Sequence, residues 1–323
     1  MATKIILDVD TGSDDAVAIM TAALSPDIDL QAVCTVAGNK CLDMTTENTL
    51  RVVELLGSKV PVYRGCAEPL VKFLCGDRIV PKQTTRAMVD GKEVQMHADY
   101  LDLPPAAIRE EALPAPSFYV DFLRKAQEPI TLVAVGPLTN LAVALLTAPD
   151  IVQKIQRIVV MGGGYKVANC TPAAEFNIWY DPEAAQRVLH CGAEVVMVPL
   201  DATHAACVTL DDCKRLRALH TPWADFAAAL CEQRITVHNA LQPLAVPDAA
   251  AVHDALAVCA VVDENVLKDV RHVHCDVGCG DFGEGQTIVD TRYLAQDLNC
   301  YFAFDADRHR FVDLLCDILA RRA

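Results

Sequence analysis

Four aspartates stand close together in KIILDVDTGSDD at residues 4–15: Asp8, Asp10, Asp14 and Asp15. Carboxylates this close raise one another's pKa unless a cation joins them. A hard, oxygen-seeking ion such as Ca²⁺ or Mg²⁺ is the simplest partner for such a group. We therefore predict a divalent-cation site. The alternative is a solvated turn before a helix that is capped by Ser13 or Asp14.

These aspartates lie where a short apolar strand meets a helix. In a strand, Leu7 and Val9 point to one face and Asp8 and Asp10 to the other. A permissive turn at residues 11–13 leads into the helical pattern of residues 16–24. Because open α/β sheets bind ligands at the carboxyl ends of their strands, this junction is a candidate site.

The rest of the chain alternates short apolar stretches with helical patterns. Strands are predicted at 29–36, 60–63, 130–135, 158–161 and 194–200, and helices at 44–56, 117–127 and 182–189. Later helices are predicted at 209–218, 222–239, 249–262 and 308–320, and two strands that could pair antiparallel at 270–275 and 286–290. This pattern predicts an α/β fold with a mostly parallel, Rossmann-like central sheet, flanked by helices and carrying the active site at the carboxyl ends of its strands.

We expect one domain over residues 1–323, because no repeat, low-complexity tract or linker divides them. Residues 69–116 differ from the rest, with several prolines, mixed charge and weak periodicity. A segment of this length without clear elements is either a functional flap or a plain surface excursion.

The composition limits the function classes. The chain is 52% hydrophobic and carries a net charge of −15, which excludes disorder and argues against binding to nucleic acid or anionic membranes. No apolar stretch approaches the ~20 residues that span a bilayer, and the N-terminus does not resemble a signal peptide. The fourteen cysteines are scattered through apolar runs, so we expect reduced thiols and a cytoplasmic location.

Two later segments carry further candidate residues. Asn169, Glu175 and Asn177 follow a triple glycine and supply donors and acceptors suited to the hydroxyls of a sugar, although each could simply cap a turn. Asp254 lies in an apolar helical pattern, where a carboxylate is costly to bury unless it is paired or bound to metal. It is therefore a second candidate ligand, and His253 beside it is a candidate general acid or a structural histidine.

Six motifs occur in a characteristic order: DVDTGSDD at 8–15, TVAGN at 35–39, VGPLTN at 135–140, MGGG at 161–164, NCTPAAEFN at 169–177 and VHD at 252–254. Together they closely resemble the inosine-uridine-preferring nucleoside hydrolases, from Lys4 to about Val262. The resemblance implies hydrolysis of the N-glycosidic bond of ribonucleosides to free base and ribose, in purine and pyrimidine salvage. It also implies a Ca²⁺ cofactor and a homodimer or homotetramer, with a nucleoside as substrate.

The resemblance also assigns roles to residues. It implies that one Ca²⁺ is held by Asp10, Asp15, the main-chain carbonyl of Val135, and Asp254. Asp10 would be the general base for a metal-bound water, His253 would donate a proton to the base, and Asp8 would support its neighbours from behind. The ribose hydroxyls would be held by Asp14, Asn39, Asn169, Glu175 and Asn177. The base side is assigned to His97, Met161 and His238.

The chain departs from the family pattern at two places. The flap motif His-Gly-x-x-Gly-Leu appears at residues 97–102 as HADYLD, without the glycines that ease flap motion. Relatives that favour pyrimidines or inosine carry tyrosines before VHD, whereas residues 231–240 offer Arg234, Thr236 and His238. The sequence therefore leaves open whether purines, pyrimidines or both are preferred.

Two other functions compete with this interpretation. A haloacid dehalogenase-type phosphatase would use Asp8 and Asp10, but Gly12 stands where that motif requires Thr or Val. A non-catalytic, Ca²⁺-dependent sensor of nucleosides or ribose would use the same ligands without turnover. An intact Asp10 argues against the sensor.

Overall fold

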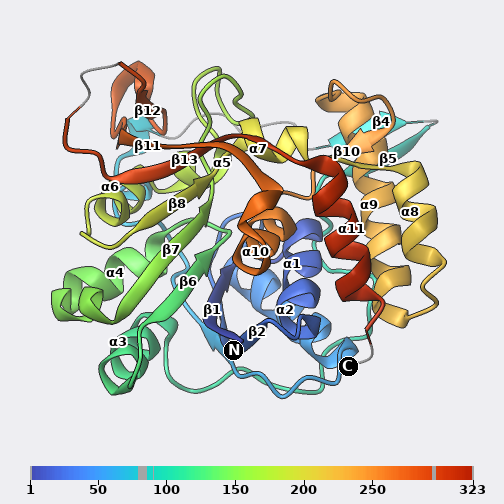
Figure 1. Cartoon of the computed structure of the whole chain (residues 1–323), viewed down its shortest axis with the longest axis horizontal. Helices are drawn as coiled ribbons and strands as arrows, with labels where there is room; N and C mark the ends of the chain where they lie inside the picture. Colours follow the sequence, from blue (N-terminus) through green and yellow to red (C-terminus); the bar gives the residue numbers. More distant parts are fainter. Residues whose placement is uncertain (1, 79–85, 90, 293–295, 322–323) are drawn as a thin grey trace.

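A computed structural model describes residues 2–78, 86–89, 91–292 and 296–321. Within these residues the chain builds a nine-stranded sheet in the order β12-β11-β13-β8-β7-β6-β1-β2-β3 (Figure 1). In chain order, its strands are β1 Thr3–Val9, β2 Ile28–Thr35, β3 Val62–Arg64, β6 Ile130–Ala134, β7 Ile155–Met161, β8 Val195–Val198, β11 Leu267–Val277, β12 Thr287–Asp290 and β13 Cys300–Ala306. Two short antiparallel pairs complete the described strands: β4 Arg86–Val89 with β5 Lys92–Gln95, and β9 Val208–Thr209 with β10 Ala249–Ala250.

The sheet is parallel from β3 to β13 and antiparallel only at its β11 and β12 edge. The predicted fold class, a mostly parallel Rossmann-like sheet in a single α/β domain, is confirmed, as is the antiparallel pairing of β11 with β12. Strand β13 was not predicted. It pairs with β8 on one side and β11 on the other, and both partners are distant in sequence.

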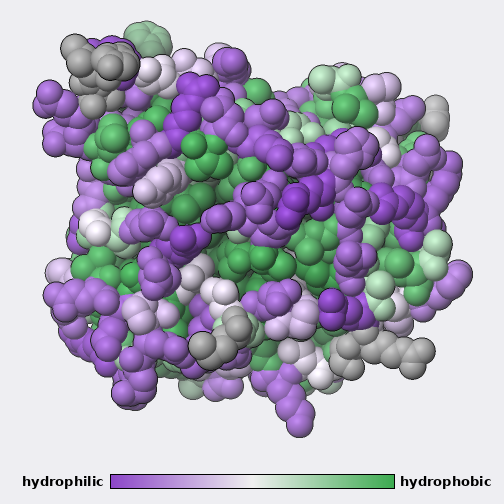
Figure 2. All heavy atoms as spheres, viewed as in Figure 1, coloured by the Kyte–Doolittle hydropathy of each residue, from purple (hydrophilic) through white to green (hydrophobic). Residues whose placement is uncertain are grey.

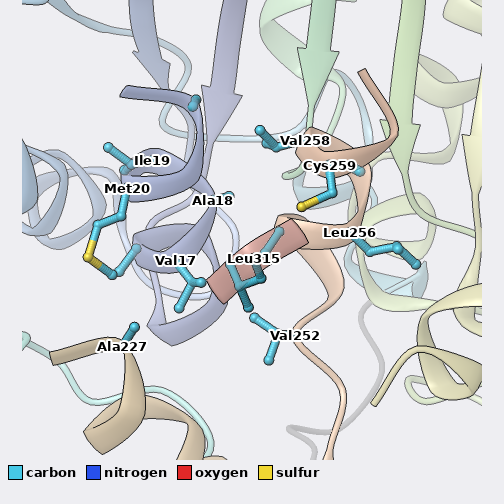
Figure 3. Packing of buried hydrophobic residues seen from close by; sticks show 14 of the residues in the cluster. Val17, Ala18, Ile19, Met20, Ala227, Val252, Leu256, Val258, Cys259 and Leu315 are labelled. Carbon is cyan, nitrogen blue, oxygen red and sulfur yellow. The ribbon is translucent and has the colours of Figure 1, made fainter. Parts of the chain in front are cut away.

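Helices cover both faces of the sheet (Figure 1). Side chains of α1, α9, α10 and α11 (Figure 3), together with those of α2, pack on one face, and those of α3, α4 and α6 pack on the other. Each large apolar side chain that these faces bury contributes about 1.5–3 kcal/mol. The helices are α1 Ser13–Leu24, α2 Leu42–Leu55, α3 Ala115–Lys125, α4 Thr139–Thr147, α5 Phe176–Tyr180, α6 Pro182–Leu189, α7 Leu200–Ala205, α8 Leu210–Arg217, α9 Pro222–Leu241, α10 His253–Val262 and α11 Arg308–Leu319.

Helix α1 begins earlier than the periodicity indicated, so Asp14 and Asp15 lie in its first turn. The predicted side-chain cap by Ser13 or Asp14 is wrong. Gly12 occupies the N-cap position, and its backbone N–H donates to Asp15 Oδ2 at 2.8 Å. Ser13 is not free to cap, because its hydroxyl lies 2.8 Å from Arg234 of α9.

Helix α10 begins at His253, later than predicted, because residues 249–250 form strand β10 instead. His253 and Asp254 therefore occupy its first turn. This places both side chains at the end of the helix that is directed toward the carboxyl edge of the sheet, beside the first turn of α1.

Residues 69–116 contain two 3₁₀ turns, at 72–74 and 76–78, and the β4–β5 hairpin, while residues 79–85 and 90 lie outside the described part. The chain after the hairpin is bound to α2. Asn48 Oδ1 accepts from the N–H of Leu101 at 2.9 Å, and Arg51 donates to the carbonyls of Leu101 and Leu103, each at 3.0 Å. That residues 69–116 act as a flap stays a prediction. Among the described residues of this segment, the prediction now applies to the β4–β5 hairpin.

Hydrophilic side chains cover most of the face shown in Figure 2, with apolar ones between them. Among the described residues, no helix combines the length and apolar composition that crossing a bilayer requires. All fourteen cysteines lie in the described part of the chain, and none forms a disulfide.

Candidate active site

A cavity of about 520 Å³ lies at the carboxyl edge of the sheet, close to the position where β1 separates β2 from β6. This is the switch point at which open α/β sheets bind ligands. Most of the candidate residues line it: Asp14, Asn39, His97, Val135, Met161, Asn169, Glu175, Asn177, His238, His253 and Asp254. The remaining two, Asp10 and Asp15, are buried directly behind Asn39.

A cluster of buried carboxylates forms one end of the site. Asp14, Asp15 and Asp254 each place an oxygen within 4.8 Å of the others. Asp10 Oδ2 accepts from the backbone N–H of Asn39 at 2.7 Å, whereas its Oδ1 is buried and has no hydrogen-bond partner among the described residues. A carboxylate oxygen without a hydrogen-bond partner, together with three further carboxylates, supplies the oxygen ligands that a hard divalent cation prefers.

Electrostatics supports the same conclusion. Burial raises the pKa of Asp10 and Asp254, and it raises the pKa of Asp15 to about 6. Neighbouring carboxylates contribute to these raised pKa values, chiefly Asp15 for Asp10 and Asp14 for the other two. A bound cation would keep all of these groups ionised, so the residues present fit a metal.

Backbone groups orient the predicted ligands. The Asp15 carboxylate accepts from the N–H groups of Asp10 at 3.0 Å and Gly12 at 2.8 Å, and from Asn39 Nδ2 at 3.2 Å. The carbonyl of Val135 accepts from Asn177 Nδ2 at 2.8 Å. Such supporting bonds fix the direction of ligand oxygens. The structure also places Asp14 within the carboxylate cluster, as its position among the four aspartates indicated, although the family resemblance assigned it to the ribose.

The predicted sugar-binding residues surround the next part of the cavity. Glu175 caps α5, accepting from the N–H groups of Asn177 at 2.9 Å and Gly163 at 2.9 Å, and burial raises its pKa to about 7. Asn169 Oδ1 accepts from the N–H of Phe176 at 3.0 Å. These side chains therefore accept hydrogen bonds from backbone N–H groups and also line the cavity. The hydrogen bonds hold the side chains in position.

Histidines form a further part of the cavity wall. His97 Nδ1 accepts from the N–H of Ser13 at 3.2 Å, and a Cβ on Gly12 would lie 2.0 Å from that nitrogen, so only glycine permits this approach. His253 Nδ1 lies 2.7 Å from Thr203 Oγ1, and its ring centroid lies 5.7 Å from that of His204. Burial lowers the pKa of His97 to about 4 and that of His253 well below its usual range.

The chain matches a known protein family over almost its whole length. Residues 5–313 match the family described as inosine-uridine preferring nucleoside hydrolase. The chain belongs to this family. A pyrimidine-specific ribonucleoside hydrolase RihA from Escherichia coli O127:H6 is 36% identical over 321 residues, which cover 99% of each chain.

Solved structures of nucleoside hydrolases share the fold. A plant enzyme, PpNRh1, superimposes with a TM-score of 0.86 at 28% identity, over 99% of each chain. A purine-preferring ribonucleoside hydrolase from Gardnerella vaginalis gives 0.85 at 29% identity, over 98% of each chain. The protein is thus a hydrolase of ribonucleoside N-glycosidic bonds, which sets aside the phosphatase and the non-catalytic sensor.

The position of Asp8 explains why the phosphatase interpretation is wrong for this hydrolase. Asp8 is not among the described residues that line the cavity. Its buried carboxylate accepts from Tyr119 Oη at 2.9 Å and from Asn140 Nδ2 at 3.0 Å, and burial raises its pKa to about 7. Asp8 therefore joins β1 to α3 and α4 behind the site.

Replacing Asn140 with Ala is expected to destabilise the hydrolase by roughly 3 kcal/mol or more. Asn140 also donates to the carbonyl of Thr35 at 3.0 Å and accepts from the N–H of Cys66 at 2.8 Å, so its loss leaves several buried polar groups unpaired. Chemical denaturation measures the effect, with the exposed Asn265→Ala as control. Equal stability of the two variants would contradict this role.

Sequence analysis assigned no role to Arg234, which the structure places in the cavity wall of the hydrolase. Arg234 is 2% exposed, and its Nη1 donates to Asp14 Oδ1 at 2.9 Å and Ser13 Oγ at 2.8 Å. The signal in the sequence was a charged residue among the apolar positions of a helix, because a buried arginine requires partners. Thr203 and His204, which adjoin His253, were also missed.

Proposed function

We propose that this nucleoside hydrolase cleaves ribonucleosides by the attack of a water whose proton passes to Asp10, and that its cofactor is Ca²⁺. The observation that carries the proposal is the buried, unpartnered Oδ1 of Asp10 beside Asp14, Asp15 and Asp254. Asp10, Asp15, the carbonyl of Val135, and Asp254 would hold the ion. When bound, the ion would acidify and position the attacking water.

The residues of the chain then divide the remaining work. Breaking the bond builds oxocarbenium character on the ribose, which nearby carboxylates favour, and negative charge on the departing base. Asp14, Asn39, Asn169, Glu175 and Asn177 would hold the ribose hydroxyls. His97, Met161 and His238 would contact the base, and His253, neutral at pH 7 when the site is empty, would donate a hydrogen bond or proton to it.

The names of two relatives support a choice of substrate class. The RihA relative at 36% identity is named pyrimidine-specific, whereas the purine-preferring structural relative is 29% identical. We therefore propose pyrimidine ribonucleosides as the preferred substrates. Release of free base and ribose fits nucleoside salvage in the cytoplasm, and we propose a homodimer or homotetramer.

The test is to incubate the purified protein with a panel of purine and pyrimidine ribonucleosides and to measure released ribose. Samples with added Ca²⁺ and samples with a chelator are run side by side. We expect ribose from pyrimidine nucleosides in the Ca²⁺ samples alone. Release of no ribose from any nucleoside, with Ca²⁺ present, would reject the proposed function.

A further inference from the structure

Helix α9 presents two buried polar side chains to the cavity, one helical turn apart. Arg234 is 2% exposed and His238 is 1% exposed, and both line the cavity. Residues four apart share a face of a helix. The two side chains therefore act on the same region of the cavity, next to His253, whose ring centroid lies 6.2 Å from that of His238.

Arg234 is held rigidly and keeps one donor group free. Its Nε donates to the carbonyl of Ala251 at 2.9 Å, and its Nη1 donates to Asp14 and Ser13. Among the described residues, Arg234 forms its hydrogen bonds through Nε and Nη1, and Nη2 forms none. Because a guanidinium only donates, Arg234 presents a permanent donor to the cavity beside Asp14.

His238 presents an acceptor. Its Nδ1 lies 3.1 Å from the carbonyl oxygen of Gln242. A carbonyl only accepts, so Nδ1 carries the hydrogen, and Nε2 of the neutral ring carries a lone pair. Burial lowers the pKa of His238 to about 4, which keeps the ring neutral at pH 7. This Nε2 is buried and has no hydrogen-bond partner among the described residues, a cost that a ligand N–H would remove.

We propose, resting on the function proposed above, that Arg234 and His238 select uracil nucleosides. Arg234 Nη2 donates to O2, the carbonyl beside the glycosidic nitrogen, and His238 Nε2 accepts from the adjacent N3–H. Uracil offers this acceptor and donor side by side. Cytosine has a lone pair at N3, which would face the lone pair of His238, and a purine has no carbonyl beside its glycosidic nitrogen.

The same contact assists bond cleavage. When the C1′–N1 bond breaks, its electron pair passes to the base and is shared between N1 and O2. The oxygen of water bonds to C1′, and the proton of water passes to Asp10. The departing uracil anion accepts the hydrogen bond that His253 donates, and it later takes a proton from solvent. A fixed donor at O2 stabilises the anion as its charge develops, which is the form of stabilisation that most strongly accelerates such steps.

The experiment measures kcat/KM for uridine, cytidine, inosine and 4-nitrophenyl β-D-riboside, whose leaving group is a stable anion without help from the protein. For the wild type we expect uridine to exceed cytidine and inosine by about tenfold or more. Arg234→Gln should lower kcat/KM for uridine by about 100-fold but that for the nitrophenyl riboside by less than about fivefold. His238→Phe should bring the ratio of uridine to cytidine close to one.

Ratios within one variant do not depend on how much of the protein folds, so a destabilised variant still gives an answer. The control is Arg217→Gln, the same substitution at an exposed ion pair with Glu232, which should leave every ratio unchanged. A wild-type preference for cytidine or inosine would overturn the proposal. An equal loss on uridine and the nitrophenyl riboside would also overturn it, because Arg234 would then act through Asp14 and the ribose. Neither result resembles failure of the proposed function, in which the wild type releases no ribose.

Discussion

Asp10→Asn is expected to lower kcat by about 10²–10⁴-fold, the range that loss of a positioned general base produces. Asparagine has nearly the same shape, and its oxygen can still accept from the N–H of Asn39, which bonds Asp10 at 2.7 Å. It cannot take a proton from water. The buried Oδ1 of Asp10, which has no hydrogen-bond partner among the described residues, is where that function would be lost.

The fold of this variant should be unharmed. Because burial raises the pKa of Asp10, the ionised carboxylate is unfavourable in the folded, metal-free protein, and a neutral amide removes that cost. Thermal unfolding without metal should therefore show a Tm equal to or above that of the wild type. Activity is measured with saturating Ca²⁺, and the exposed Asp121→Asn is the control. Near-native turnover would remove Asp10 from the role of base.

Removing divalent cations is expected to abolish turnover and to lower the Tm at pH 7 by about 10 °C. A ligand at a thousand times its Kd stabilises by about 4 kcal/mol, and 1 kcal/mol corresponds to about 2–4 °C for a protein somewhat smaller than this one. The physical cause is the repulsion among Asp10, Asp14, Asp15 and Asp254, which a cation offsets. Asp254→Asn, with one carboxylate fewer, should show a smaller rise in Tm when Ca²⁺ is added.

The folding stability of the metal-free protein is expected to fall with rising pH, because of Asp15. The folded-state pKa of Asp15 is raised to about 6 from an ordinary value of 3.8, so between these pH values the folded protein binds more protons than the unfolded one. Stability is therefore greatest at the acidic end of this window and falls as pH rises through 6. With Ca²⁺ bound, the Tm should lack this fall. A chelator that changes neither Tm nor turnover would show that the cluster holds no metal.

Much of the fold and half of the site could be predicted because the relevant signals are local. The apolar period of β1 and the four aspartates after it occupy one continuous stretch, so their junction at a strand end follows from residues 4–15 alone. Strand and helix alternation then implies a parallel sheet, whose carboxyl ends meet at one edge. Asn169, Glu175, Asn177 and Asp254 were predicted in the same way, from polar residues in unusual places.

Other features depend on contacts between distant residues, which no local pattern encodes. Residues 300–306 form strand β13 by pairing with β8 and β11. The structural role of Asp8 depends on its hydrogen bonds with Tyr119 and Asn140. Asp8 and Asp10 share an acidic motif, yet only Asp10 remains beside the cavity, because α3 and α4 supply donors to Asp8 within the core.

On the base side of the site, the sequence determines which residues are present, and the tertiary structure determines what they can do. The sequence by itself determined that residues 231–240 offer an arginine and a histidine one helical turn apart. Only the tertiary structure decided their roles, by bringing Arg234 to Asp14 across 220 positions and by leaving Nε2 of His238 buried without a partner among the described residues. A side chain's type is written in the sequence, but its free donors and acceptors depend on which partners the fold has already given it.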